Sequence, residues 1–489
     1  MKQSASIIVV FALLFVPVVL LAAEVASQPS KTPAAKEQEA VKITLHPMAA
    51  TRPALKYQLL PPFLDRRPGN AAVRWNRLSA EQTQFLTELN KPGGLWEKAD
   101  KWMALPIGDP REKEFRAKEA AVNQLLQSSL FAEMDYAARF ESCDWELPLR
   151  EGHIYAMTLP EVQMNRTSGH MLAAKAHGEI IDKKYGDAVR TFQTGLALAR
   201  QNAHGQTLIH ALVGSAIATS ITNQIEQFIQ QPDAPNLYWA LSVLPQPLID
   251  YRPAWECEMN GLVLQFPELR DLDKKKLGKE QWDEALQRLE REWIFLSGMS
   301  SGGNDLPDDA AVMARVALLG PAAKQYLVDR GRKKADVDAM PQSQAILLYT
   351  ISYYEELRDD EFKVVFLPQT ESGARLAAFE ATLRERGRQE IIPIASLLLP
   401  ALANAKQAEV RVPWTIARLR IVEALRIYAA AHQGQLPERL SDLGEVPLPV
   451  NPYDGKPFTY HRDGNRAVLG CESGPRNTSW RYEITMVAK

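Results

Sequence analysis

The feature that most constrains this fold is a long run of helical periodicity that begins after Pro110. As far as residue 404, apolar side chains mostly recur every three or four positions, which is the spacing of an amphipathic α-helix. The chain has 489 residues, of which 46% are hydrophobic, so it has ample material for a packed core. The sequence therefore predicts a mainly α fold: an irregular array of helical hairpins over residues 111–404, with a small α+β module at the C-terminus.

Several helices are predicted inside this stretch. They run over residues 161–181, 185–196, 204–230, 253–265 and 277–296, and a further one begins at Pro341. The acidic cluster from Glu355 to Glu361 is expected to close that last helix as a solvated end. The segment from Ile391 to Ala405 is strongly apolar but short, and it contains Pro393 and Pro400. It therefore predicts a buried helix rather than a membrane span.

One pair of these helices resembles a tetratricopeptide hairpin. Ala188 and Phe192 stand at the small and large packing positions of its second helix. The first helix departs from the repeat, because Lys175 and Glu179 occupy positions that are usually apolar or aromatic. No second copy keeps the period of about 34 residues. The resemblance implies one such hairpin in an irregular array and not a regular repeat protein.

The N-terminus has the pattern of a secretory signal. Lys2 precedes an apolar run from Ile7 to Leu21. The run also approaches the length of a membrane span. Residues 1–23 are therefore expected to be a cleaved signal peptide or an anchor that attaches the chain to a membrane through residues 5–23. Either way the protein is expected to be exported, and to be periplasmic or anchored facing outside the cytoplasm.

The following segment, residues 24–110, is rich in proline and predicts a linker. One strand or extended segment is expected within it, over residues 54–60.

Composition argues against several classes of function. The chain has 57 basic and 59 acidic residues and no basic stripe interleaved with aromatic side chains, so nucleic acid is not an expected partner. Three cysteines, Cys143, Cys257 and Cys471, allow one intramolecular disulfide at most. The sequence has no Cys-x-x-Cys pair, which leaves zinc and redox sites without support, and no cofactor is predicted.

Residues 405–489 follow a different pattern. A buried stripe marks one long helix, Gly434 allows that helix to end, and Pro437 is placed to open a short helix. Residues 457–461, 466–471 and 481–487 are predicted as strands. Before the strands comes the phrase Val450-Asn451-Pro452-Tyr453-Asp454-Gly455-Lys456-Pro457-Phe458. This order of elements resembles the soluble part of the major pseudopilins of type II secretion.

The resemblance implies a specific loop and a candidate ion site. In those pseudopilins the phrase that contains Asn451, Pro452, Gly455 and Pro457 here shapes a loop before the sheet, and loops of the domain can hold calcium. The usual aspartate is Asn451 in this chain, which removes one charge. Asp454 and Asp463 are calcium candidates, beside the simpler interpretation of an Asx and proline loop. The methylation signal and polymerising helix of the pseudopilins are absent at residue 1, so we expect a borrowed pilin-like module and not a filament subunit.

A further resemblance covers more of the chain and carries less information. The phrases over residues 53–57, 236–241 and 362–368 look like those of an uncharacterised family of exported bacterial proteins. This resemblance implies no particular activity.

Three motifs are interpreted as structural. Gly298-Met299-Ser300-Ser301-Gly302 matches the nucleophile-elbow pattern but lacks a preceding strand, so a flexible linker is expected. The acidic pairs Asp308-Asp309 and Asp359-Asp360-Glu361 cannot each form a catalytic pair, because helix neighbours point about 100° apart. Four histidines lack the spacing of paired metal ligands and are expected to be packed or hydrogen-bonded: His170, His177, His204 and His210.

Together these observations predict an exported, non-enzymatic scaffold or adaptor. Its helical region would bind a protein or peptide partner in the cell envelope, and its pilin-like module would dock to another envelope component. Two alternatives remain open: an exported helical hydrolase acting on polysaccharide, with carboxylates from different helices, and a purely structural envelope protein. A deep pocket with two acidic side chains would favour the hydrolase, and a broad shallow surface would favour the adaptor.

Overall fold

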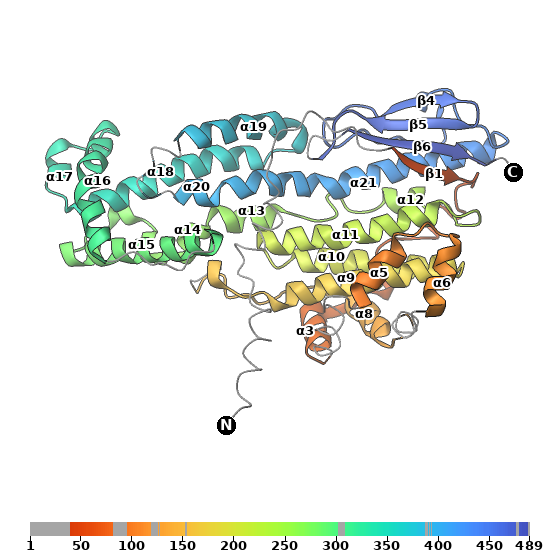
Figure 1. The fold of residues 1–489 in the computed structure, drawn as a ribbon, viewed down its shortest axis with the longest axis horizontal. Helices are drawn as coiled ribbons and strands as arrows, with labels where there is room; N and C mark the ends of the chain where they lie inside the picture. The colour runs from red at the N-terminus through yellow and green to blue at the C-terminus, as the bar shows by residue number, and fades with distance from the viewer. Residues whose placement is uncertain are drawn as a thin grey trace. The chain divides into compact units, whose positions relative to one another are not determined.

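The computed structural model describes residues 40–81, 95–118, 126, 128–151, 154–301, 309–386, 390, 392, 394–475 and 479–487. The predicted signal segment, residues 1–23, lies outside this described part. The described chain is mostly helical and carries a small four-stranded sheet (Figure 1) and a separate pair of strands, which confirms the mainly α prediction.

By contacts the chain divides into two units, each assembled from separated stretches, whereas the sequence predicts consecutive segments. The sheet-bearing unit contains the described parts of residues 40–146, 160–253 and 407–489, and the helical unit contains those of residues 147–159 and 254–406.

The sheet-bearing unit begins with short elements and continues into three long helices. Its elements are β1 (Val41–Leu45), η1 (Phe63–Asp65), β2 (Arg67–Asn70), α3 (Ala71–Glu81), α5 (Leu95–Met103), α6 (Pro110–Lys118), α8 (Leu130–Ala138), β3 (Phe140–Ser142), α9 (Pro160–Ile181), α10 (Tyr185–Ala203), α11 (Leu208–Ile229), α12 (Tyr238–Ser242), the part of α21 (Pro400–Ala431) that follows residue 406, η6 (Leu440–Asp442), β4 (Thr459–Asp463), β5 (Arg466–Cys471) and β6 (Trp480–Met486).

Helices α9, α10 and α11 pack closely because glycine occurs where their backbones approach. A methyl group added at Gly169 of α9 would lie 2.8 Å from Ile217 of α11, and one at Gly195 of α10 would lie 2.5 Å from Ile221. Ala188 and Phe192 are fully buried in the α9–α10 hairpin. The predicted hairpin of α9 and α10 is therefore present. Its resemblance to the tetratricopeptide repeat remains a prediction. Helix α11 is the one described helix that is long and apolar enough to cross a membrane, and 72% of its most apolar window is buried inside the protein.

The sheet combines strands from both ends of the described chain. Its order is β1-β6-β5-β4, in which β4, β5 and β6 form an antiparallel meander and β1 pairs in parallel with β6, from Val41 beside Tyr482 to Leu45 beside Met486. The three C-terminal strands agree with the predicted ones within two residues. The predicted strand over residues 54–60 was wrong, since that segment forms turns, and β1 supplies the strand instead. Strands β2 and β3 form a separate parallel pair.

The helical unit is centred on one long helix. Its elements are η2 (Ile154–Ala156), α13 (Arg252–Met259), α14 (Gly261–Gln265), η3 (Pro267–Leu269), η4 (Leu272–Lys274), α15 (Lys279–Ser301), α16 (Asp309–Asp329), α17 (Lys334–Asp338), α18 (Gln342–Val365), α19 (Gln369–Arg386), α20 (Ile394–Leu398) and the first part of α21. Helix α18 packs against α15, α16, α19 and α20, and is buried on most of its surface.

Several predicted boundaries need correction here. Helix α15 extends to Ser301, so residues 298–301 are helical and not a flexible linker, while Gly302 lies outside the described residues. The apolar segment over residues 391–405 forms two helices, because Pro400 begins α21. Helix α18 continues past the acidic cluster to Val365, and Glu361 is only 1% exposed, so this residue is not part of a solvated helix end. Pro437 precedes only the single turn η6 and opens no α-helix.

Candidate docking face on the C-terminal sheet

The four-stranded sheet buries one face and exposes the other. Side chains alternate along each strand. Leu469, Tyr482 and Ile484 point inward and are at most 1% exposed, whereas His461 and Arg481 point outward and are exposed. Val468 also lies on this outer face, 36% exposed. The outer face is therefore a surface of mixed polarity that a partner could reach.

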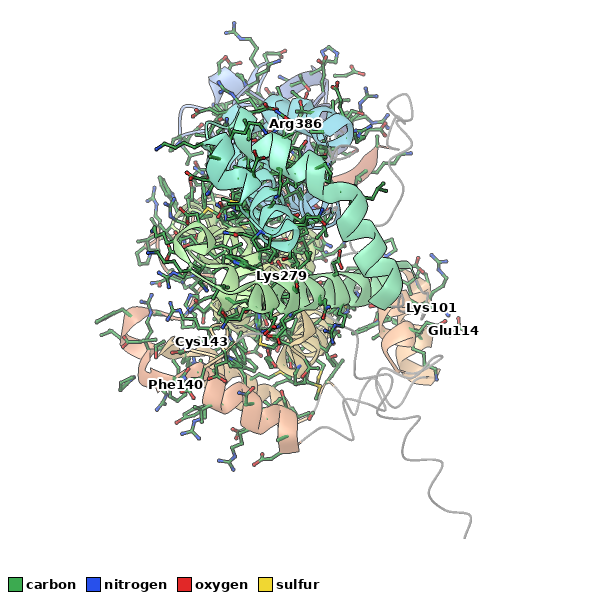
Figure 2. All side chains as sticks on the ribbon, turned by 90° about the vertical axis from the view of Figure 1, so that its left-hand side faces the viewer. Lys101, Glu114, Phe140, Cys143, Lys279 and Arg386 are labelled. Carbon is green, nitrogen blue, oxygen red and sulfur yellow. The ribbon has the colours of Figure 1, made fainter. Side chains whose placement is uncertain are left out.

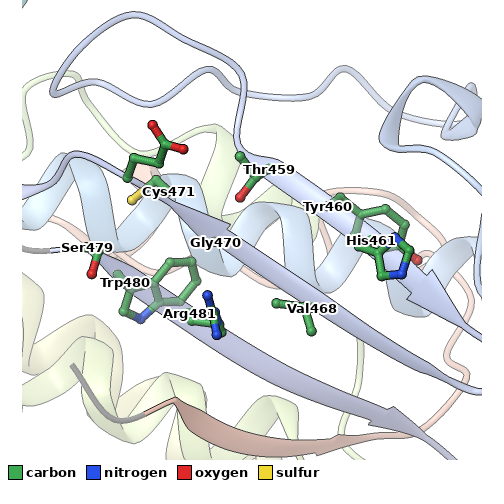
Figure 3. A pocket seen from close by; sticks show the side chains of 10 residues that line it. Thr459, Tyr460, His461, Val468, Gly470, Cys471, Ser479, Trp480 and Arg481 are labelled. Carbon is green, nitrogen blue, oxygen red and sulfur yellow. The ribbon is translucent and has the colours of Figure 1, made fainter. Parts of the chain in front are cut away.

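A glycine creates a hollow in this face. Gly470 of β5 lies in register between Thr459 of β4 and Arg481 of β6. Because Gly470 has no side chain, the neighbouring residues line a depression of about 390 Å³ (Figure 3). The glycine is also required by packing, since a methyl group here would lie 2.7 Å from the carbonyl oxygen of Trp480.

The rim of the hollow is rich in donors. Within the described part of the chain, neither Arg481 nor His461 makes an ion pair or a side-chain hydrogen bond. Glu472 supplies one acidic group at the end of the hollow. An unpaired guanidinium beside a hollow favours a partner that carries a carboxylate.

Strand β4 leaves one backbone edge open. Gly464, with φ of +62°, and Asn465 form the two-residue turn between β4 and β5. Such a turn places Asp463, His461 and Thr459 in hydrogen-bonded pairs with β5, so the N–H and C=O groups of Tyr460 and Arg462 point away from the sheet. No further strand pairs with this edge among the described residues. Strand β4 is short and carries the charges of Arg462 and Asp463, and both features disfavour nonspecific pairing of its edge with other strands.

A buried arginine attaches the sheet to the helices beneath it. The Arg418 guanidinium of α21 lies 4.2 Å from the Trp414 ring, 4.3 Å from the Trp480 ring and 5.4 Å from the Tyr482 ring. The Tyr482 hydroxyl donates a hydrogen bond to Glu226 of α11. Burial raises the pKa of this hydroxyl well above its usual value, so it stays protonated and acts as the donor. These contacts join β6 to α21 and α11 on the inner side of the sheet.

A second buried contact, an ion pair within α21, holds the part of this helix that follows Arg418. Glu423 and Arg426 are 2.9 Å apart and completely buried. Glu423 accepts hydrogen bonds from the Leu237 N–H and the Asn236 amide, and Arg426 donates to the carbonyl oxygens of His46 and Ala234. Burial raises the pKa of Glu423, and the nearby Arg426 charge acts in the opposite direction. The pair is satisfied on every side, which indicates a structural role.

The predicted loop residues form a turn held by side-chain to backbone hydrogen bonds. The Asn451 side chain donates to the Ser473 carbonyl oxygen and accepts from the Tyr453 N–H, and Asp454 accepts from the Lys456 N–H, as in an Asx turn. Gly455 takes the positive φ of +74° that the turn requires. Pro452 and Pro457 lie within the same loop.

The two calcium candidates belong to different parts of the C-terminal module. Asp454 precedes β4, whereas Asp463 ends it, about 13 Å further along the strand from Thr459. Across the described residues, no group of three or more His, Cys, Asp or Glu side chains could hold a metal ion.

The four histidines are separately packed. The His177 Nδ1 is 3.0 Å from the Gln224 Oε1, and the His170 Nδ1 is 3.7 Å from the Asp100 Oδ1. Burial lowers the pKa of His204.

His210 has an arrangement that resembles a hydrolytic triad. Its Nδ1 is 2.7 Å from the Thr207 Oγ1, and its Nε2 is 3.3 Å from the Glu161 Oε1. However, Thr207 is 4% exposed and His210 is fully buried, and a methyl group on Gly205 would lie 2.1 Å from the imidazole ring. Since Thr207 also caps α11 by accepting from the His210 N–H, this arrangement is a helix cap and not an accessible nucleophile.

The three cysteines are free and buried, so none forms the disulfide that the sequence allows. Burial raises the pKa of the Cys143 and Cys257 thiols to about 12, which keeps both protonated and unreactive.

Sequence reasoning missed β1 and the outer sheet face. The alternation of Val41-Lys42-Ile43-Thr44-Leu45 was a usable strand signal. The hollow has no local signal, because it depends on the register of three strands. No family model, curated protein or solved structure matches this chain.

Proposed function

We propose that this chain is an exported adaptor whose C-terminal pilin-like module docks to another protein of the cell envelope. The observation that carries the proposal is the open β4 edge beside the hollow at Gly470. An extended peptide could continue the sheet at Tyr460 and Arg462, which is the mode called β-augmentation. An acidic side chain of a partner segment that lies over the outer face would pair with Arg481 of β6, beside the hollow.

The pilin-like assignment is supported by element order. A long helix, the Asn451 loop and an antiparallel meander follow one another as the resemblance to the pseudopilins implies, with the single turn η6 where a short helix is expected. Strand β1 is an addition to that pattern, because it brings residues 41–45 into the sheet. The structural alternative, an envelope protein without a specific partner, would leave the β4 edge unused.

The hydrolase alternative has less support. Four described acids have raised pKa values, and two of them are held by structural contacts: Glu179 by Lys175 and Thr191, and Glu423 by Arg426. Glu355 and Glu361 share α18, but six residues place them about 120° apart around the helix axis. This arrangement does not form the facing carboxylate pair that glycoside hydrolysis needs.

Site-specific photocrosslinking in the native envelope tests the docking face. A photoreactive amino acid replaces His461, and a control replaces Val243, which is 51% exposed in the same unit. We expect a discrete crosslinked protein from position 461 and none from position 243. No product at 461, or the same products at both positions, would contradict the proposal.

A matched pair of variants tests the backbone edge. Arg462→Pro removes an N–H that points away from the sheet, and edge positions of this kind tolerate proline. Arg462→Ala loses the same Glu438 ion pair and keeps the N–H. We expect the crosslink to fall several-fold in the proline variant and to persist in the alanine variant. Equal crosslinking in both would exclude β-augmentation.

A further inference from the structure

A second surface of the sheet-bearing unit exposes apolar side chains at η1. Phe63 is 73% exposed and Leu64 is 92% exposed. The turn is held in shape, because the Asp65 N–H donates to Pro62 and the Arg66 side chain donates to Pro61. Two adjacent apolar side chains at the tip of an ordered turn are a feature that a partner or a membrane would cover.

Three arginines that follow this turn have no acidic partner among the described residues. The Arg66 guanidinium lies 6.0 Å from the Phe63 ring, and the Arg67 and Arg74 guanidinium groups lie 4.9 Å and 5.5 Å from the Tyr136 ring. Arg74 also lies 5.7 Å from Phe140, which Figure 2 labels. Within the residues that the structure describes, none of these three arginines makes an ion pair.

The acids nearby do not cancel this positive charge. Asp65 pairs with Arg139 at 3.0 Å, and Asp135 pairs with both Arg139 and Arg190. Two further acidic groups lie close to β2: exposed Glu141 of β3, and exposed Asp144, whose backbone is hydrogen-bonded to the Asn70 side chain. The positive charge of Arg66 also acts on Arg200. The pKa of Arg200 is lowered by burial and, to a smaller extent, by the charge of Arg66.

We propose that the Phe63–Leu64 turn inserts into the interface of a bilayer that carries anionic headgroups. The apolar pair would enter the boundary between headgroups and acyl chains, and Arg66 and Arg67 would contact the headgroups. A protein partner would also cover apolar side chains. The unpaired arginines that follow the tip in the chain favour a surface of negative charge, which an anionic bilayer provides. This inference is independent of the docking face on the sheet.

A fluorescent probe on the full chain tests the insertion. Since the three native cysteines are buried, Leu64→Cys can be labelled selectively with an environment-sensitive dye, and Val450→Cys, at a position 53% exposed, serves as the control. Both labelled chains share the same N-terminal segment, so any difference between them reports on the turn. With vesicles of phosphatidylcholine and phosphatidylglycerol, we expect a blue shift at position 64 and none at position 450. Equal shifts at both positions, or none at position 64, would overturn the proposal.

Two double variants test the role of charge. Arg66→Gln with Arg67→Gln is expected to weaken vesicle binding by on the order of 30-fold, from about 1 kcal/mol for each basic residue at the surface. Arg66→Lys with Arg67→Lys keeps the charge and should retain most binding. If the chain bound vesicles of phosphatidylcholine alone equally well, the proposed contact between the arginines and anionic headgroups would be overturned. A photocrosslink from position 64 to a protein, without any vesicle response, would assign the turn to a protein partner instead.

Discussion

The side-chain amide of Asn451 donates a hydrogen bond to the backbone carbonyl oxygen of Ser473, 2.8 Å away. Asn451 is 1% exposed, and its side-chain oxygen accepts from the Tyr453 N–H at 3.0 Å. One amide therefore joins the loop before β4 to the segment after β5. A carboxylate could accept the second bond but has no N–H to make the first.

Asn451→Asp should destabilise the sheet-bearing unit by about 1–3 kcal/mol, because it places a buried carboxylate against the Ser473 carbonyl oxygen. Urea denaturation would measure the loss. Asp454→Asn is the matched control and should cost little, since asparagine can still accept from the Lys456 N–H. If calcium raised the unfolding temperature of the unaltered protein, Asp454 and Asp463 would regain support as ligands.

Glu361 should make stability depend on pH in the helical unit. Burial and, secondarily, the charge of Glu380 raise its pKa to about 8, from an ordinary value of 4.5. The folded state therefore holds a proton that the unfolded state releases, so stability falls as pH rises from 5 to 8, by on the order of 3–4 kcal/mol.

Glu361→Gln should remove most of this slope and should be more stable than the unaltered protein at pH 8. Denaturation curves collected at several pH values would measure both effects. Parallel pH profiles for the two proteins would mean that Glu361 is ionised in the fold.

Tyr482→Phe should cost about 2 kcal/mol, because it removes a hydrogen bond to the charged Glu226. Tyr460→Phe is the comparison, since it removes a neutral bond of 3.0 Å to the Pro437 carbonyl oxygen and should cost about 1 kcal/mol. Thermal or chemical unfolding of both variants would compare the two losses of stability. A smaller loss for Tyr482→Phe would show that the link to α11 contributes little.

Thr207→Val should destabilise α11 by about 1–2 kcal/mol, because the cap of the His210 N–H is lost. Thr207→Ser keeps the hydroxyl and should remain close to the unaltered protein. Hydrogen exchange at the start of α11 would locate the effect. Unchanged exchange in the valine variant would argue against the capping role.

The elements that the sequence predicted best depend on local patterns. Helices α9 and α10 and strands β4, β5 and β6 each repeat an apolar period within one segment, so their type could be read without knowing their neighbours. Strand β1 has the same kind of alternation, but it is five residues long, and its partner β6 lies more than 400 residues away in the chain. No local signal indicated that pairing.

Glu361 and Gly470 show what only the tertiary structure decided. Glu361 belongs to an acidic run that is typical of a solvated helix end, yet the packing of α18 buries it. Gly470 is one glycine among 26, and it creates a hollow only because the register places Thr459 and Arg481 on either side. Local periodicity thus determined helices such as α10 and the C-terminal strands. Burial of single charges, strand register and the parallel partner of β6 were decided by contacts between segments far apart in the chain, whose free energies do not appear in any local pattern.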